Sequence, residues 1–207
     1  MGESYRINML PLSIVLVPHQ PVLLQLVEKR FRELAPTLGE CGIVGTCFVQ
    51  QTASDSTPEA LAATGMILKV ELAQSLGDDS TMVAVRGVRR VRIDEWNHEG
   101  EIPEALVTDL DDEQAPDPEI LKATQSAVRA LQNLVSEIDV DRSQFNCSFD
   151  EDPVIAAWQC CAFAEMSQRD RQDVISTQDV NDRLRLVMEI CCERYGDWQR
   201  RIASDED

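Results

Sequence analysis

The chain has 207 residues, which is enough for one large domain or two small ones with a proper apolar core. Apolar residues make up 43% and charged residues 27%, close to the averages of globular proteins, so the composition argues against wholesale disorder. Nineteen basic and 37 acidic residues give a net charge of −18, which repels nucleic-acid phosphates and anionic lipids over most of the surface.

The first predicted elements are an extended segment and a helix. Met9–Val17 is apolar and contains a proline at position 11, so we expect it to run near a sheet edge. Pro21–Ala35 is predicted as a helix, because its apolar residues recur at steps of three and four along one face. Those residues are Leu23, Leu24, Val27, Phe31 and Leu34.

Strands dominate the next stretch. Gly42–Gln50 is predicted as a strand, followed by a polar loop. Thr64–Gln74 and Thr81–Trp96 alternate apolar and polar residues, and Gly77–Ser80 between them has the composition of a turn, so we expect a hairpin. A last strand is expected at Ala105–Leu110.

The pattern changes at Asp109–Pro116, whose acidity and proline predict a linker. Only helices are expected after it. Asp117 and Asp152 each precede a proline, the order of an N-cap and a first helical residue. Ser167 opens a capping box, and Thr177 is expected to cap the last helix. We therefore predict an α+β protein with a β-rich unit at residues 1–112 and a helical bundle at residues 113–207.

The sequence lacks the motifs of phosphate-binding loops, dinucleotide-binding folds, zinc proteases and serine hydrolases. The only histidines, His19 and His98, have no cysteine at ligand spacing, and only three lysines are present. We expect no catalytic residue, metal or cofactor. Seven cysteines without a C-x-x-C pair, in a chain whose start lacks a signal peptide, predict reduced, mostly buried thiols in a cytoplasmic protein.

One basic cluster stands out on the strand Thr81–Trp96. It contains Arg86, Arg89, Arg90 and Arg92, which could form a phosphate-binding face. No aromatic residues interleave with these arginines as stacking platforms for bases. We expect them to pair with acidic residues across the sheet instead, and we expect no nucleic-acid partner.

Three stretches form an ordered set over nearly the whole chain. Leu10–Pro18 is followed by an apolar segment ending in an acid, an arginine and an aromatic residue, at Glu28, Arg30 and Phe31. The hairpin ends in a G-x-x-R pattern at Gly87 and Arg90. The helical part contains Asp152-Pro153, Met166-Ser167 and, after Thr177, the stretch Asn181-Asp182-Arg183-Leu184. In order and separation these motifs resemble the N-terminal domain of Lon proteases, also called the Lon substrate-binding domain.

The resemblance implies a small, twisted, barrel-like sheet that packs one helix and is joined to a helical bundle. The chain carries neither the ATPase nor the protease module of full-length Lon proteases, and its end, Ser204–Asp207, is polar, so we expect a stand-alone domain. The resemblance also implies that the function is recognition of polypeptides without catalysis. The alternative is an adaptor or scaffold that binds one folded partner or a small molecule.

The expected polypeptide contacts lie on the first strand and its turn, where prolines suggest an unpaired edge. They are Leu12, Ile14, Leu16 and His19. A second set is expected to have a structural role, with Arg30 partly buried and paired to an acid or a carbonyl group. This set comprises Glu28, Arg30, Phe31, Gly87 and Arg90.

Overall fold

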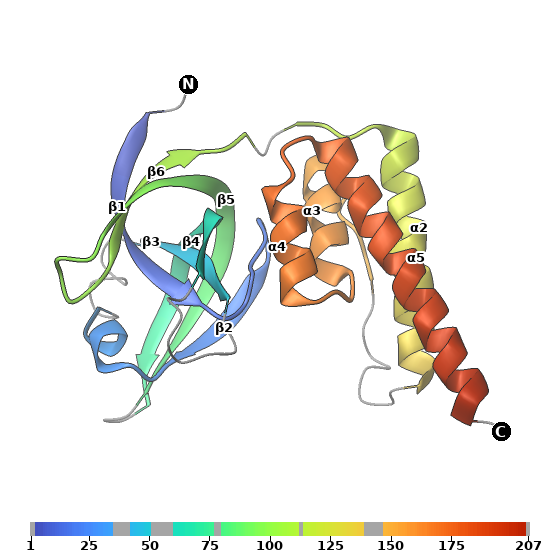
Figure 1. The fold of residues 1–207 in the computed structure, drawn as a ribbon, viewed down its shortest axis with the longest axis horizontal. Coiled ribbons are helices and arrows are strands. Elements are labelled where there is room, and N and C mark those ends of the chain that lie inside the picture. Colours follow the sequence, from blue (N-terminus) through green and yellow to red (C-terminus); the bar gives the residue numbers. More distant parts are fainter. Residues whose placement is uncertain are drawn as a thin grey trace. The chain divides into compact units, whose positions relative to one another are not determined.

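The computed structural model describes residues 3–34, 42–50, 60–76, 80–111, 114–138 and 147–205. The chain divides into two compact units, residues 1–112 and residues 113–207. The first contains the strands, drawn blue to green in Figure 1, and the second contains the long helices, drawn yellow to red. This arrangement confirms the α+β prediction.

The first unit is built on one curled sheet whose strands run in the order β2-β5-β4-β3-β1-β6. The sheet closes on itself because β6 also pairs with β5, which confirms the barrel-like form. The strands are β1 (Ser4–Leu12), β2 (Pro21–Leu26), β3 (Ile43–Gln50), β4 (Ala60–Ser75), β5 (Thr81–Asn97) and β6 (Glu104–Asp109). Antiparallel pairing of β4 with β5 confirms the predicted hairpin, whose turn at residues 77–79 lies outside the described residues.

The length of β5 creates a free strand edge. Residues 81–86 of β5 pair with β2, and residues 91–97 pair with β6. The barrel closes where β6 pairs with residues 91–97 of β5. Because β2 pairs with residues 81–86 instead, it extends the sheet outside the closed barrel. Among the strands that the structure describes, β5 alone pairs with β2.

The two halves of β1 pair with different strands. Residues 4–8 pair antiparallel with β6, and residues 9–12 pair parallel with β3. Pro11 lies in the second half, where β3 is the one partner strand among the described residues. A residue without an N–H group is tolerated there because only one side of the strand forms a ladder.

The helix predicted over Pro21–Ala35 is wrong. Residues 21–26 form β2, and helical structure begins at residue 29 and continues to residue 34. Leu24 and Leu26 alternate into the core with the two-residue period of a strand, while Phe31 and Leu34 enter the same core from the helical residues. The spacing of apolar residues in this segment fits both the 3.6-residue period of a helix and the two-residue period of a strand. Residues 21–26 form a strand because they pair with β5.

Apolar clusters cover the sheet on both sides. One joins residues of β1, β3, β4, β5 and β6, including Met9, Ile67 and Val91. The other contains Leu10, Met66 and Val83 together with the side chains from β2 and the helical residues 29–34. Neighbouring residues such as Met66 and Ile67 point to opposite faces, yet both are buried, so both faces of β4 are covered there.

The second unit contains α2 (Pro118–Ile138), α3 (Pro153–Phe163), α4 (Gln168–Ser176) and α5 (Val180–Asp205). Asp117 accepts hydrogen bonds from the amides of the first turn of α2, and Asp152 does the same for α3, which confirms both N-caps. Ser167 and Asp170 form the predicted capping box. No helix in the described ranges is long and apolar enough to cross a membrane.

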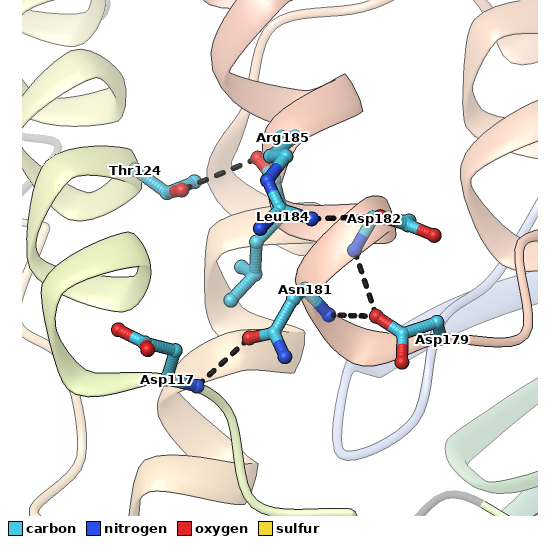
Figure 2. Close-up of polar contacts among 7 residues, drawn as sticks. All are labelled: Asp117, Thr124, Asp179, Asn181, Asp182, Leu184 and Arg185. Carbon is cyan, nitrogen blue, oxygen red and sulfur yellow. Dashed lines mark hydrogen bonds and ion pairs between the residues drawn. The ribbon is translucent and has the colours of Figure 1, made fainter.

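The predicted cap at Thr177 is wrong in its role. Thr177 ends α4, and its hydroxyl donates to the carbonyl group of Asp173 at 3.0 Å. Asp179 caps α5 instead, accepting hydrogen bonds from the amides of Asn181 and Asp182 at 2.8 and 3.0 Å (Figure 2). Both residues have capping side chains and stand two positions apart, so sequence alone did not separate the end of one helix from the start of the next.

The Asn181–Leu184 stretch ties α5 to its neighbours. The side-chain oxygen of Asn181 accepts a hydrogen bond from the amide of Asp117 at 2.8 Å, and the Thr124 hydroxyl donates to the Leu184 carbonyl group at 3.2 Å (Figure 2). Arg183 is buried, with its guanidinium carbon 3.8 Å from the centre of the Trp158 ring. The motif in this segment therefore packs helices together.

Candidate functional site

The structure separates the four residues expected to contact polypeptides. Leu12 and Ile14 are half-buried and pack against the apolar core, whereas Leu16 belongs to the core itself with 3% of its surface exposed. His19 is exposed and occupies the left-handed region with φ of 64°. Of this set, Leu16 is unavailable to a partner in this conformation, and binding by the others remains a prediction.

The segment before β2 lies directly against Gly87. A β-carbon on Gly87 would collide with the carbonyl group of Val17, so only glycine permits this approach. The amide of His19 donates to the Gly87 carbonyl at 2.8 Å, and the Gly87 amide donates to the carbonyl of Gln20 at 3.1 Å. Gly87 thus holds the turn that leads into β2.

Glu28, Arg30 and Phe31 form a small cluster just after β2. Arg30 donates to the carboxylate of Glu28 at 2.9 Å, and its guanidinium carbon lies 4.5 Å from the centre of the Phe31 ring. Phe31 is buried in the core. Arg30 is thus paired with an acidic group, and 46% of its side chain is exposed.

The arginines of β5 are engaged by acidic groups. Arg86 pairs with Glu71 of β4 and Arg89 pairs with Asp109 of β6, each at 2.7 Å, as expected for pairs across the sheet. Arg92 pairs with Asp94 of its own strand. Arg90 differs from the others: it is 1% exposed and donates to the carbonyl group of Asp111 at 3.4 Å.

A hollow of about 470 Å³ brings together residues that are far apart in the sequence. Leu12, Glu28 and Arg30 line it, and so do Trp96 near the end of β5 and His98 just after that strand. The rings of Trp96 and His98 stack with centroids 5.6 Å apart. The walls of the hollow combine the Glu28–Arg30 ion pair with aromatic and aliphatic side chains. Within the described residues, no group of three histidine, cysteine, aspartate or glutamate side chains is placed to hold a metal ion.

The most distinctive surface of the first unit is apolar and was missed by the sequence analysis. Leu23 of β2 and Leu72 of β4 both stand opposite Ala84 of β5, so the three form one row across the sheet. Leu23 is 64% exposed and Leu72 is 60% exposed. Because the adjacent Leu24 is buried and the adjacent Ala73 packs against the core, this row lies on the face turned away from the core.

The apolar row continues along the strands. Met82 stands in the next outward position of β5, and Val27 and Leu76 follow directly after β2 and β4, with 62% and 55% exposure. We call this set the outer stripe. It consists of Leu23, Val27, Leu72, Leu76, Met82 and Ala84. Gln25 and Gln74, which stand opposite Met82 on either side, interrupt the set, so the apolar surface is continuous only across Leu23, Ala84 and Leu72. Two isolated exposed leucines would be ordinary, but a row of exposed apolar side chains across three strands is typical of an interaction surface.

The outer stripe ends at the free edge of β2. The six residues of β2, PVLLQL, contain no charged side chain, and the only proline stands in the first position. Exposed strand edges are usually protected by charges, internal prolines or bulges. Among the described residues, β2 pairs with β5 alone and pairs without a register shift. Within the described part of the chain, the second edge of β2 therefore has no partner strand.

The buried thiols are unsuited to nucleophilic chemistry. Burial raises the pKa of Cys47 to about 12 and that of Cys191 to about 12, and it also raises the pKa of Cys160. A thiol held in its protonated form is a poor nucleophile. Cys192 is exposed, and the described cysteines are all free.

Solved structures with a similar fold include two N-terminal domains of the Lon type. The Lon N-terminal domain protein from Xanthomonas campestris is 19% identical, with a TM-score of 0.63, and the match covers 89% of this chain and 98% of that one. The N-terminal domain of the Mycobacterium avium complex Lon protease is 18% identical, with a TM-score of 0.62, and the match covers 91% and 98%. No curated protein matches the sequence.

The sequence itself matches one family over most of its length. Residues 6–193 match the family described as the ATP-dependent protease La (LON) substrate-binding domain. The matched range contains β1 from residue 6 onward, strands β2 to β6, the outer stripe and most of the helical unit. The chain therefore belongs to the Lon substrate-binding domain family.

Proposed function

We propose that the chain is a recognition module that binds exposed apolar segments of polypeptides and performs no chemistry on them. The observation that carries the proposal is the outer stripe, whose row Leu23–Ala84–Leu72 places exposed apolar side chains across three strands on the face of the sheet opposite the core. Burial of such side chains by a partner contributes about 25 cal/mol per Å² of apolar surface removed from water. Membership of a family described as substrate-binding supports the same function.

Recognition without catalysis fits the chemical character of the described residues. The thiols in the core are held protonated, and the arginines of β5 are paired with acidic groups or buried. We also propose a cytoplasmic location, where reduced thiols persist. An exposed apolar surface requires no reactive group to bind an unfolded chain, since desolvation of side chains supplies the free energy.

The test is a titration with a fluorescently labelled polypeptide that is kept unfolded by reduction and alkylation. We expect saturable binding by the wild type and loss of binding by the double variant Leu23→Lys/Leu72→Lys, which places charges at two positions of the outer stripe. The matched control is Val88→Lys, which alters an exposed apolar residue of β5 outside the stripe and should bind normally. Mass spectrometry of the polypeptide after incubation should find it unaltered.

Two results would contradict the proposal. One is failure of the wild type to bind any unfolded polypeptide while a single folded protein co-purifies with it in fixed ratio, which would favour the adaptor alternative. The other is a polypeptide that is cleaved or modified in a manner that a single substitution abolishes.

A further inference from the structure

We propose that the partner segment binds as an additional β-strand along the free edge of β2. This inference rests on the proposed function and adds the geometry and the chemistry of the bound segment. The strand edge and the outer stripe meet at Leu23, which is exposed on the outer face of the last strand. A segment at this edge would satisfy backbone groups and cover apolar side chains at the same time.

The backbone of β2 favours an extended occupant. In an antiparallel ladder, alternate residues direct their N–H and C=O groups toward the partner strand, and the residues between them direct these groups outward. With β5 on one side of β2, the outward groups of residues 22–26 face the free edge. A helix or a small apolar molecule cannot form a ladder with them, whereas an extended polypeptide can.

The length and composition of β2 define the bound core. Six residues span about 20 Å at the rise of a strand, so a segment of about five or six residues fills the edge. Since β2 has no charged side chain, an uncharged partner core meets no unpaired charge. Alternate side chains of this core would lie on the outer face, beside Pro21, Leu23 and Gln25.

The charge of the molecule favours basic flanks. The net charge of −18 over the whole chain speeds the approach of a positively charged chain, and this effect weakens with salt because the Debye length is roughly 10 Å at 0.1 M. The same charge opposes a second copy of this chain at the edge, because two copies would bring −18 together with −18. The proposed ligand is therefore a short, extended, apolar segment with lysine or arginine on either side.

Added-strand binding differs measurably from binding across the face of the sheet. Neighbouring strands lie about 4.8 Å apart, so an added strand would be beside Leu23 but about 14 Å from Leu72, three strand spacings away. A segment lying across the outer stripe would contact both leucines. The two residues have nearly equal exposure, so Leu23→Lys and Leu72→Lys form a matched pair that adds the same charge to the same face.

The probe is a fluorescent peptide with a core of six alternating valines and threonines and two lysines at each end. Its affinity is measured by fluorescence anisotropy against the full-length chain and against each variant. Two further peptides carry N-methyl groups on the odd or on the even residues of the core, which removes the N–H donors on one side of the strand. A fourth peptide has glutamates in place of the lysines.

We expect one N-methylated peptide to lose affinity by about tenfold or more and the other to remain within about twofold, since only one set of N–H groups faces β2. Leu23→Lys should weaken binding of the unmodified peptide by about tenfold, whereas Leu72→Lys should change it by less than about twofold. The glutamate peptide should bind about tenfold more weakly at low salt. Backbone amides in residues 22–26 should gain protection from hydrogen exchange when the peptide binds.

Other results would overturn the inference, and they are distinguishable from failure of the proposed function. Equal losses for Leu23→Lys and Leu72→Lys, with both N-methylated peptides binding normally, would place the segment across the outer stripe and leave polypeptide recognition intact. Equal binding of the glutamate peptide would overturn the basic flanks. A concentration-dependent dimer that Leu23→Lys dissociates would assign the edge to a second copy. Absence of any peptide binding would contradict the proposed function itself.

Discussion

Replacement of Gly87 by alanine should destabilise the first unit, because the turn before β2 depends on a bare α-carbon at this position. The added methyl group would meet the carbonyl group of Val17 and the α-carbon of Pro18, and both are backbone atoms that cannot rotate away. The backbone of the turn must therefore move off β5. That movement stretches the two hydrogen bonds that join Gly87 to His19 and Gln20.

The structure sets the size of the effect. Each of the two hydrogen bonds contributes about 0.5–1.5 kcal/mol, and overpacking of a close contact costs about 1–3 kcal/mol. Alanine also restricts the unfolded chain, which offsets these losses by about 0.4–1 kcal/mol. We expect Gly87→Ala to lower the free energy of unfolding by about 2–4 kcal/mol.

Urea denaturation at 25 °C, followed by circular dichroism, measures this loss. Hydrogen exchange at the amides of His19 and Gly87 reports whether the loss is local to the turn. The matched control is Gly196→Ala in α5, where the nearest atom to the added methyl group would be a side-chain nitrogen of Arg200 at 3.6 Å. That change should stabilise the helix by about 0.5–1 kcal/mol, since alanine is the better helix former.

Equal unfolding midpoints for Gly87→Ala and the wild type would refute this reasoning. Slower or unchanged exchange at the two amides would do the same, because the predicted damage lies in their hydrogen bonds. If only the Gly196→Ala control behaves as expected, the close approach of Val17 to Gly87 is not a constraint on the fold.

The remaining predictions concern caps, ion pairs, thiols and the arginines of β5. Asp152→Ala should lower the free energy of unfolding by about 1 kcal/mol by removing an N-cap, whereas Glu151→Ala beside it should change it by less than about 0.5 kcal/mol; thermal unfolding compares the two. Arg30→Ala should cost less than about 1 kcal/mol, because the pair with Glu28 is half-exposed, and a double-mutant cycle measures the coupling. The free energy of unfolding should fall as the pH rises from 9 toward 12, because the unfolded chain releases the Cys47 proton near pH 9 while the folded chain keeps it until about pH 12. Urea unfolding midpoints measured across this range should decline less steeply in Cys47→Ala than in the wild type. Duplex DNA at physiological ionic strength should give no salt-sensitive shift, because the β5 arginines are paired or buried, and a shift would contradict that account.

Much of the fold could be predicted from local sequence patterns. The alternation of β4 and β5 and the capping residues Asp117, Asp152 and Ser167 were predictable, because each depends on residues a few positions apart. The segment after Pro21 was not. Its apolar spacing fitted a helix as well as a strand, and the choice depended on β5, which is about 60 residues away along the chain.

The candidate site was harder to predict than the fold. Leu23 looked like part of a helix face and Leu72 like part of an alternating strand, so neither signalled an exposed apolar surface. The row that they form with Ala84 exists only when β2, β5 and β4 lie side by side in one register. Conversely, Leu16 was a candidate contact because it lies near prolines, and the structure places it in the core.

The sequence by itself determined the α+β class, the order of the helices, the N-caps of α2, α3 and α4, and the family, since these follow from residue patterns that are short or repeated in order along the chain. Only the tertiary structure decided which strand ends the sheet and which apolar side chains remain outside. Those outcomes depend on pairing between strands that are distant in the sequence. A strand at the end of a sheet buries one face against the core, and its alternate side chains and one row of its backbone groups remain available to a partner.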